Sequence, residues 1–307
     1  MRILLTGGAG FIGSHVARAL LTEGHEVIVL DDLSSGKREQ VPAGAGLVVA
    51  DIRSEEAARL IMDEAPEALV HHAAQIDVRR SVADPRFDSD VNVGGTLNLL
   101  EACVRAGTRK VVFASTGGAI YGEQDVFPAG EGHPSRPTSP YGCAKASVEL
   151  YLGYYRQVHG LSWIALRSAN VYGPHQDPHG EAGVVAIFCN RLLDGDPCTI
   201  FGDGTATRDY VYVGDVARAN LLALKSDHQG PINIGTGKET DVATLHRLLA
   251  RAAGVEAEPI LADARPGEQR RSCIDPSLAS EVLGWEPEME LSRGLSTTLE
   301  HFRKERG

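Results

Sequence analysis

A tyrosine and a lysine stand four residues apart in the segment Tyr141-Gly-Cys-Ala-Lys145. On a helix this spacing places both side chains on one face, so that the ammonium group can lie beside the phenol. A phenol has an ordinary pKa of about 10 and is almost entirely protonated at neutral pH. Because a neighbouring cation stabilises the phenolate, the pair predicts a general base that removes a proton from a hydroxyl group.

Two hydroxyl side chains, Ser115 and Thr116, follow an apolar segment and precede this helix in the chain. We assign Thr116 to hydrogen-bond the hydroxyl group that Tyr141 deprotonates, with Ser115 as the alternative. The predicted catalytic residues are therefore Tyr141, Lys145, Thr116 and Ser115.

A glycine-rich segment, Gly7-Gly8-Ala9-Gly10-Phe11-Ile12-Gly13, lies between an apolar run and a helical pattern. Gly7 permits a tight turn, Gly10 lets the backbone approach a pyrophosphate, and Gly13 lets the helix pack close to the strand. The N–H groups of the first helical turn, which contains Phe11 and Ile12, attract phosphate oxygens. The segment therefore predicts a dinucleotide site after the first strand.

An acid, Asp31, ends the second apolar run, 18 residues after Gly13. At this position a carboxylate accepts hydrogen bonds from the adenosine ribose and repels a 2′-phosphate, so NAD is favoured over NADP. Asp32 and Ser35 lie on the same loop and complete this part of the predicted site. A bound NAD would also bring a second positive charge to Tyr141, whose pKa must fall by ~3 units, or about 4 kcal/mol, to act at neutral pH.

The next two apolar runs also end in polar or small residues. Asp51 and Ile52 follow the third run and are expected near the adenine. Ala73, Ala74 and Gln75 follow the fourth run and are expected beneath the cofactor. Each of these residues lies at the end of a predicted strand.

Strands and helices alternate over the first 170 residues. Strands are predicted over 2–6, 27–30, 47–50, 68–73, 110–114 and 163–167, and helices over 11–23, 54–64, 88–106 and 140–159. Ser54 and Pro140 favour helix starts at their positions. Because the strands are continuous apolar runs joined by helices, they predict an α/β fold with a Rossmann-type, doubly wound parallel sheet covered on both faces.

The pattern changes after Asn170, where polar residues, glycine and proline are frequent and shorter elements follow. Helices are expected near 182–194, 215–225, 242–253 and 291–303, with a strand pair near 199–201 and 209–212. We predict an NAD-binding domain over 1–170 and a smaller C-terminal substrate-binding lobe over 171–307. Some segments after residue 205 are expected to return to the first domain.

The composition disfavours several other classes of protein. The formal net charge of the 307 residues is −11, which disfavours nucleic acid as a partner, and no apolar run is long enough to span a membrane. The five cysteines are odd in number and lack C-x-x-C spacing, so we expect reduced thiols in a cytoplasmic protein without a metal site. The first ten residues lack the pattern of a signal peptide, since glycines follow a short apolar run.

Taken together, these motifs resemble those of the UDP-glucose 4-epimerase family, in order and along essentially the whole chain. The matching segments are Thr6–Ser14, His72–Ala74, Asn92–Thr96, Ser115–Thr116, Tyr121–Gly122, Tyr141–Lys145, Asn170–Pro174, Arg208–Tyr212, Ile234–Gly237 and Arg265–Glu268. The resemblance adds His72 and Asn92 to the predicted cofactor residues.

The resemblance also implies a set of substrate residues besides Thr116 and Tyr141. Asn170, Arg208 and Arg265 resemble the residues that bind the substrate diphosphate, and guanidinium groups suit phosphate because they can make two parallel hydrogen bonds. Glu268 resembles the acid that holds the uridine ribose, and Phe201 resembles the aromatic residue near the uracil.

The family's reaction is implied as well. Tyr141 would remove the proton of the sugar 4-hydroxyl while C4 passes a hydride to tightly held NAD, and the 4-keto sugar would turn over before the hydride returns. The cofactor carries this chemistry, and the protein supplies the base, the orientation and the anchor. The resemblance thus implies 4-epimerisation of a UDP-hexose, UDP-glucose and UDP-galactose first, by a homodimer paired through the helices near 88–106 and 140–159.

Several residues depart from the family pattern and leave the sugar open. Ser168 and Ala169 replace aromatic residues near the nicotinamide, and His175 replaces a frequent arginine. Ser272 stands where a tyrosine or cysteine gates sugar size. A serine there leaves room for the larger groups of UDP-N-acetylglucosamine or UDP-glucuronate.

Two other functions on the same scaffold are alternatives. Relatives that are nucleotide-sugar 4,6-dehydratases carry an Asp-Glu pair after the hydroxyl residue, whereas Gly117-Gly118 follow Thr116 here, and this argues against elimination. Non-catalytic NAD-sensing proteins usually lack the tyrosine–lysine pair, which this chain has.

Overall fold

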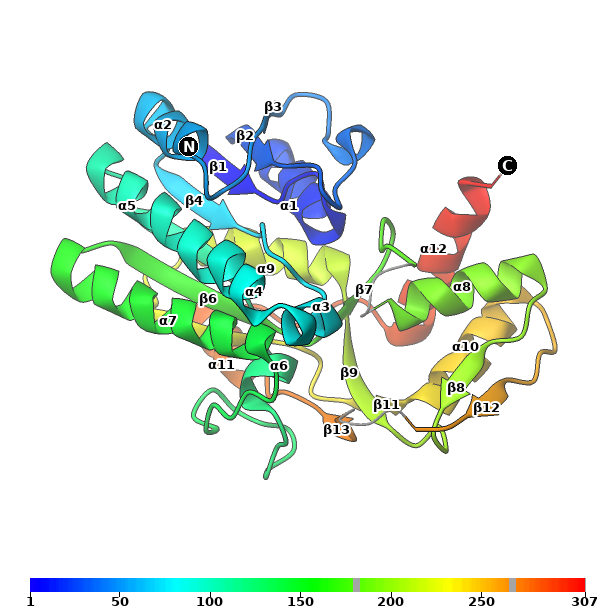
Figure 1. Cartoon of the computed structure of the whole chain (residues 1–307). Coiled ribbons are helices and arrows are strands. Elements are labelled where there is room, and N and C mark those ends of the chain that lie inside the picture. The colour runs from blue at the N-terminus through cyan, green and yellow to red at the C-terminus, as the bar shows by residue number, and fades with distance from the viewer. Residues whose placement is uncertain (179–182, 265–268, 307) are drawn as a thin grey trace.

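A seven-stranded parallel sheet forms the centre of the molecule (Figure 1). The computed structural model describes residues 1–178, 183–264 and 269–306. From edge to edge the sheet contains β10 (Gly230–Ile234), β6 (Ser162–Ser168), β5 (Lys110–Thr116), β4 (Ala68–His71), β1 (Arg2–Thr6), β2 (Glu26–Asp31) and β3 (Gly46–Val49). The strand order reverses at β1, and this confirms the predicted doubly wound parallel sheet.

The carboxyl ends of the central strands share one edge of this sheet. Thr6 on β1 is level with His71 on β4, which is level with Phe113 on β5. Thr116, at the end of β5, is level with Ser168, at the end of β6. The loops that follow these strands therefore meet along the edge where open α/β sheets bind their ligands.

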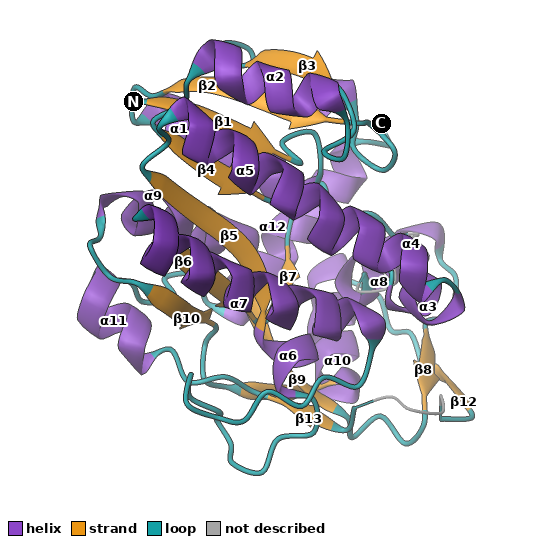
Figure 2. Ribbon diagram, turned by 60° about the vertical axis from the view of Figure 1, so that its left-hand side comes forward, coloured by secondary structure: helices purple, strands orange, loops and turns teal. Residues whose placement is uncertain are grey.

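Helices cover both faces of the sheet (Figure 2). One face is covered by α1 (Phe11–Thr22), α9 (Val213–Lys225) and α11 (Ser277–Leu283), and the other by α2 (Glu55–Glu64), α5 (Thr96–Ala106) and α7 (Pro140–His159). Ser54 caps α2 by accepting a hydrogen bond from Ala57 N, and Ser139 caps α7 in the same way ahead of Pro140. The predicted starts of both helices are thus confirmed.

A smaller lobe lies beside the carboxyl edge and has a core of its own (Figure 1). Its helices are α8 (Val184–Asp194), α10 (Val242–Ala253) and α12 (Leu291–Lys304). Its strands are β7 (Asn170–Tyr172), β8 (Thr199–Phe201), β9 (Thr207–Tyr212), β11 (Glu239–Asp241), β12 (Ile260–Ala262) and β13 (Arg271–Ser272). After β9 the chain leaves this lobe and adds α9 and β10 to the seven-stranded sheet and its helical cover. It then returns to the lobe at β11.

The strand pair expected near 199–201 and 209–212 is wrong as a pair, although both strands exist. β8 pairs with β12, whereas β9 lies between β11 and β13 and also contacts β7. Between β8 and β9, Gly202 and Gly204 both adopt positive φ angles, of 75° and 77°. Such angles turn the chain sharply and suit glycine, so the two strands diverge into separate sheets.

The single helix expected over 88–106 is also interrupted. It consists of α4 (Pro85–Ser89), a π-helical segment at Asp90–Gly95 and α5, and the short helix α3 (Val78–Ala83) precedes it. The remaining short elements are a 3₁₀ turn at Arg38–Gln40 and α6 (Gly117–Tyr121). Among the helices of the described residues, none combines the length and apolar character that a membrane span requires.

Candidate active site

The glycine-rich loop between β1 and α1 packs so closely against neighbouring backbone that two of its positions have no room for a side chain. Gly7 has a φ angle of 70°, and a Cβ there would lie 2.6 Å from the backbone nitrogen of Ala73. A Cβ at Gly13 would lie 2.0 Å from the carbonyl oxygen of Gly7. At Gly10 a Cβ would meet only that same carbonyl, at 3.3 Å, so packing alone demands a glycine less strictly there. This contrast fits a loop whose Gly10 backbone is kept clear for a pyrophosphate.

The start of α1 presents its N–H groups at this loop. The first bond of the helical ladder runs from Ser14 N to Gly10 O at 3.0 Å, and the helix begins at Phe11. The N–H groups of Phe11, Ile12 and Gly13 therefore lie outside the helix's own ladder. Together with the positive end of the helix dipole, they suit the oxygens of a diphosphate.

The predicted ribose acid, Asp31, is buried at the end of β2. Its Oδ2 accepts a hydrogen bond from Ala9 N and its Oδ1 one from Leu33 N, both at 2.9 Å. Burial raises the pKa of Asp31, and these two N–H groups partly offset the rise. A carboxylate can accept about four hydrogen bonds, so lone pairs remain for ribose hydroxyls. Asp32 and Ser35 lie exposed on the following loop.

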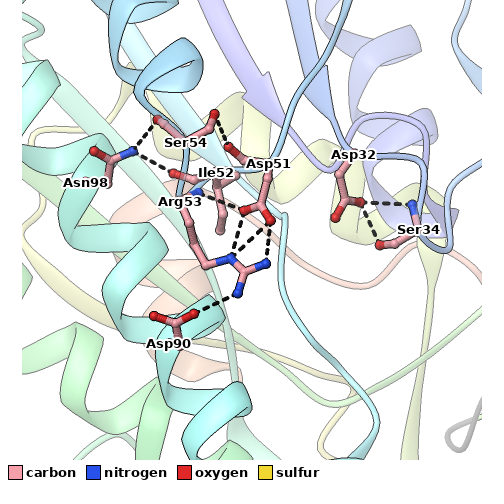
Figure 3. A network of polar contacts seen from close by, with 8 residues as sticks. All are labelled: Asp32, Ser34, Asp51, Ile52, Arg53, Ser54, Asp90 and Asn98. Atoms are coloured by element: carbon pink, nitrogen blue, oxygen red, sulfur yellow. Dashed lines mark hydrogen bonds and ion pairs between the residues drawn. The ribbon is translucent and has the colours of Figure 1, made fainter.

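The predicted adenine residues are fixed by a polar network at the end of β3 (Figure 3). Arg53 donates to both carboxylate oxygens of Asp51, and its Nη1 donates to Asp90 Oδ2 at 2.7 Å. Asn98 Nδ2 donates to the carbonyl of Ile52 at 2.8 Å. Arg53 therefore ties the loop after β3 to the π-helical segment, and it holds the pKa of Asp51 below its usual range.

The residues after β4 form a second buried network. Gln75 N donates to Asn92 Oδ1 at 2.8 Å, and Asn92 Nδ2 donates back to the carbonyl of Gln75 at 3.0 Å. His72 Nε2 is 2.9 Å from Asn220 Oδ1, and Ala73 N donates to Thr6 Oγ1. Ala74 is half-buried between these anchored neighbours. The side chain of Asn92 is thus occupied by Gln75, so it supports the loop that is predicted to lie beneath the cofactor.

The proposed base and its cation come together as expected at the start of α7. Lys145 Nζ lies 5.8 Å from the centre of the Tyr141 ring and 4.6 Å from that of Phe113. It donates a hydrogen bond of 2.8 Å to the carbonyl of Ala114, so β5 holds the ammonium in place. Tyr141 N donates to Ser81 Oγ at 3.3 Å, which fixes the first turn of α7 against α3.

The charges of this pair are set by burial. Burial lowers the pKa of Lys145 to about 8, and the negative charges of Asp88 and Glu149 offset part of the fall. Burial raises the pKa of Tyr141, and the charge of Asp88 raises it further. The protein's own groups therefore favour the protonated phenol. A lowered pKa of Tyr141, as the sequence led us to expect, requires the additional positive charge of an oxidised nicotinamide.

The two candidate hydroxyl residues have different partners. Ser115 is buried, and its Oγ donates to Glu149 Oε1 at 2.6 Å. Thr116 is half-buried at the end of β5, where its Oγ1 accepts a weak bond of 3.3 Å from Ala119 N. The Thr116 hydroxyl therefore keeps a free proton for another acceptor, whereas that of Ser115 is already engaged. This difference favours Thr116 over Ser115.

The predicted substrate residues lie on the neighbouring small sheets. Asn170 begins β7 and is level with Tyr210 on β9, two residues from Arg208. Phe201 ends β8 with 37% of its surface exposed. Arg265 and Glu268 lie outside the described residues. Since β7 directly follows β6, the sheet that carries Asn170 and Arg208 adjoins the strand end that carries Thr116.

The departures from the family pattern surround the same region. Ser272 is buried on β13 and level with Arg208, and its Oγ lies 3.5 Å from where a Cβ of Gly118 would be. Ser168 and Ala169 are half-buried at the end of β6. His175 bonds to Ser14 Oγ through Nδ1 at 3.0 Å and so joins the second lobe to α1. Within the described ranges, no group of three His, Cys, Asp or Glu side chains could hold a metal ion.

Sequence motifs did not identify two buried carboxylates near Lys145. Glu149, one turn after Lys145, forms an ion pair with Arg167 at 2.5 Å, and both side chains are more than 90% buried. Asp88 accepts hydrogen bonds from Gln75 and Asn92. The only available signal was spacing, since Glu149 follows Lys145 by four residues, and Asn92 follows Asp88 by four, as neighbours on a helix do.

Comparisons with known proteins agree with this geometry. Residues 3–235 match the model of the NAD dependent epimerase/dehydratase family. The chain is 48% identical, over 309 aligned residues and 99% of each chain, to a UDP-glucose 4-epimerase of Mycolicibacterium smegmatis. It is 49% identical to the UDP-glucose 4-epimerase of Thermotoga maritima in its crystal structure with UDP-glucose, with a TM-score of 0.98 and 100% of both chains covered. For the Thermus thermophilus UDP-glucose 4-epimerase in complex with NAD, the identity is 49%, the TM-score 0.93 and the coverage 99% of each chain.

The glycine-rich loop, the tyrosine–lysine pair and these full-length similarities lead to one assignment. The chain belongs to the NAD-dependent epimerase/dehydratase family.

Proposed function

We propose that this protein interconverts UDP-glucose and UDP-galactose by inverting the sugar at C4. The observation that carries the proposal is the position of Tyr141 and Lys145. Lys145 is bonded to the carbonyl of Ala114, two residues before Thr116 on β5, so the pair stands at the carboxyl end of that strand, on the same edge of the sheet as the glycine-rich loop. A base, a hydroxyl anchor and a dinucleotide loop are thereby brought to one place, and oxidation of a secondary alcohol needs all three.

The chain's own residues have separate roles in this reaction. Tyr141 takes the proton of the sugar 4-hydroxyl and later returns it, and Lys145 stabilises the phenolate from its fixed position on Ala114. Thr116 orients the reacting hydroxyl. The loop at Gly7–Gly13, Asp31 and Asp51 would hold NAD, and the bound cofactor would supply hydride acceptance and return at C4. The net reaction consumes no cofactor, since the hydride lost in one half is regained in the other.

The substrate is anchored by the small lobe in this proposal. Asn170 and Arg208, on adjoining strands, bind the diphosphate in this proposal, and Arg265 shares that role. Phe201 binds the uracil and Glu268 the uridine ribose. A diphosphate held at several points stays fixed while the sugar ring rotates. We accordingly assign 1–170 to NAD and 171–307 to the nucleotide sugar, with α9 and β10 as the part of the second range that joins the first.

UDP-N-acetylglucosamine and UDP-glucuronate are the second candidate substrates. The small side chain of Ser272 supports them, because it lies on β13 next to Arg208 and close to Gly118. The residues that follow Thr116 argue against a 4,6-dehydratase. Gly117 and Gly118 open α6 directly after Thr116 and bring no carboxyl group for the elimination of water.

Incubation of the purified protein with UDP-galactose, without added NAD, tests the proposal. We expect UDP-glucose to form, because a tightly held cofactor is regenerated in every turnover. In parallel incubations, turnover of only UDP-N-acetylglucosamine or UDP-glucuronate would change the proposed substrate and keep the proposed reaction. A 4-keto, 6-deoxy product would instead identify a dehydratase and overturn the proposed reaction.

We also propose that the protein is a cytoplasmic homodimer. All five cysteines are free, and Cys143 is exposed, as suits a reducing compartment. Four apolar side chains form a stripe on the outer face of α7, with the exposed fractions 78% for Leu150, 41% for Tyr151, 50% for Tyr154 and 58% for Val158. Their spacing places them on one helical face, and such contiguous apolar surface marks protein interfaces.

The variant Leu150→Glu is expected to weaken the dimer by about 100-fold or more, as for an interface hot spot, because it places a charge on the most exposed side chain of the stripe. Analytical ultracentrifugation over a range of concentrations measures the effect. Val126→Glu is the matched control, since Val126 is also exposed, at 63%, but lies on the loop after α6. Equal dimer stability in both variants would exclude this face as the interface.

A further inference from the structure

Asp88, on α4, is a buried carboxylate whose two oxygens have unequal surroundings. Its side chain has no exposed surface. Oδ1 accepts hydrogen bonds from Gln75 Nε2 at 2.9 Å and from Asn92 Nδ2 at 3.0 Å. Oδ2 is buried and has no hydrogen-bond partner among the described residues. A buried charge with a bare oxygen is costly, so its presence calls for an explanation.

A comparison with Glu149 shows how unusual this arrangement is. Glu149 is also buried, but Arg167 and Ser115 donate to its oxygens and Arg167 balances its charge. For Asp88 no cation of the described chain lies within ion-pair distance. Among the described residues, only two neutral amides donate hydrogen bonds to Asp88, and the charge of Lys145 acts on it through space. Burial raises the pKa of Asp88, and these groups offset part of the rise.

Asp88 lies on a helix that packs against α7, the helix of the catalytic pair. Asp88 acts electrostatically on both Tyr141 and Lys145, because α4 and the π-helical segment pack against α7. The same carboxylate anchors Gln75 and Asn92, the two residues that hold the loop after β4. Asp88 therefore holds the loop after β4 by hydrogen bonds and also changes the pKa of Tyr141 through its charge.

The other titratable groups around Lys145 are either balanced by a partner or neutral, so Asp88 is the unbalanced negative charge near it. Glu149, on the same helix, is balanced by Arg167. His71 and His72, on and just after β4, are neutral at ordinary pH, because burial lowers the pKa of His71 to about 3 and of His72 to about 4.

We propose that Asp88 is a positioning residue of the reaction, which steadies the Lys145 cation through space and fixes the loop at Gln75 through its amide contacts. The inference rests on the proposed function, since it concerns the base and the cation of that reaction. Asp88 acts through Tyr141, Lys145 and Gln75 and not by contact with substrate or cofactor.

The variant Asp88→Asn separates the two roles, because its amide oxygen can still accept from Gln75 and Asn92 while the charge is lost. Without that charge the pKa values of both Tyr141 and Lys145 fall, since Asp88 raises each of them. The acid limb of the kcat–pH profile reports Tyr141 and the alkaline limb Lys145. We expect both limbs to move toward acid by roughly one pH unit, the lower end of what a neighbouring charge produces.

The matched control is Asp84→Asn, which removes the same charge one turn earlier on an exposed cap of α4. Its profile is expected to coincide with that of the wild type. Asp88→Ser is a second variant for the case that Asp88→Asn does not fold. It removes the charge in a smaller side chain, and the same acid shift is expected.

A readout without turnover distinguishes this inference from the proposed function. The ultraviolet absorbance of the Tyr141 phenolate, obtained against Tyr141→Phe over a pH series with NAD bound, should develop at lower pH in Asp88→Asn. The inference is overturned if, in both Asp88 variants, the limbs of the kcat–pH profile and the phenolate absorbance appear at the same pH as in the wild type. This holds even where kcat falls. A wild type that is inactive on every UDP-hexose, yet shows the absorbance shift on Asp88→Asn, overturns the proposed function and keeps the inference.

Discussion

Replacing Tyr141 with phenylalanine is expected to lower kcat for UDP-galactose by about 10³-fold, in the middle of the range that a general base contributes. The ring keeps its place, because the contact that fixes this turn runs from the backbone N of Tyr141 to Ser81. Only the hydroxyl that takes the proton is lost. Initial rates at saturating substrate measure the change, with bound NAD determined on the same sample.

The control for this prediction is Tyr151→Phe, which removes an equivalent hydroxyl from an exposed position of the same helix. We expect it to turn over at the wild-type rate. A Tyr141→Phe protein that retains more than about a tenth of the wild-type kcat contradicts the assignment of the base, since loss of general base catalysis costs at least about 100-fold.

Much of the fold follows from local features of the sequence. Continuous apolar runs predicted strands that are buried on both faces, and the structure has them within a few residues of the expected limits. The cap at Ser54 and the proline at Pro140 predicted helix starts that the structure confirms. These signals are local, because a cap or a buried strand depends on its own few residues.

The features that the sequence did not predict depend on distant contacts. β8 takes its partner from β12, some 60 residues later in the chain, and neither strand carries a pattern that selects the other. The π-helical segment looks like ordinary helix in sequence, yet Gly95 packs so closely on Ile52 that a Cβ would lie 2.6 Å from it. A three-residue strand and a widened helical turn are both decided by packing.

The site divides in the same way. Glycine spacing, the acid at the end of β2 and the tyrosine–lysine pair carry their chemistry in residue type, so the sequence alone made them candidates. The partners of Ser115 and the unbalanced charge of Asp88 were not visible, because a serine or an aspartate in a helix-rich segment is most often exposed. Asn92 was predicted only in part. The sequence showed that it belongs to a motif but not that its side chain bonds to Gln75.

The variant Arg167→Leu is expected to lower the free energy of unfolding by about 3–5 kcal/mol, the usual loss when one partner of a buried ion pair is removed. Arg167 donates to Glu149 through Nε at 3.0 Å and Nη2 at 2.5 Å, and through Nη1 to Tyr121 OH at 3.0 Å. Without it, Glu149 is a buried carboxylate with Ser115 as its remaining side-chain donor. Urea denaturation at a fixed NAD concentration measures the loss, because bound ligand adds to stability.

The double variant Arg167→Leu/Glu149→Leu distinguishes an unpaired charge from simple loss of packing. If the unpaired carboxylate causes the damage, removing it as well should restore part of the stability, because two apolar side chains can replace a buried ion pair at little cost. A double variant that is less stable than Arg167→Leu alone would mean that Glu149 still contributes without its partner. Activity adds a second measure, since Glu149 stands one turn after Lys145 and its charge supports the ammonium. In Arg167→Leu that charge is no longer balanced, so the alkaline limb of the pH profile should move toward higher pH, opposite to the shift expected for Asp88→Asn.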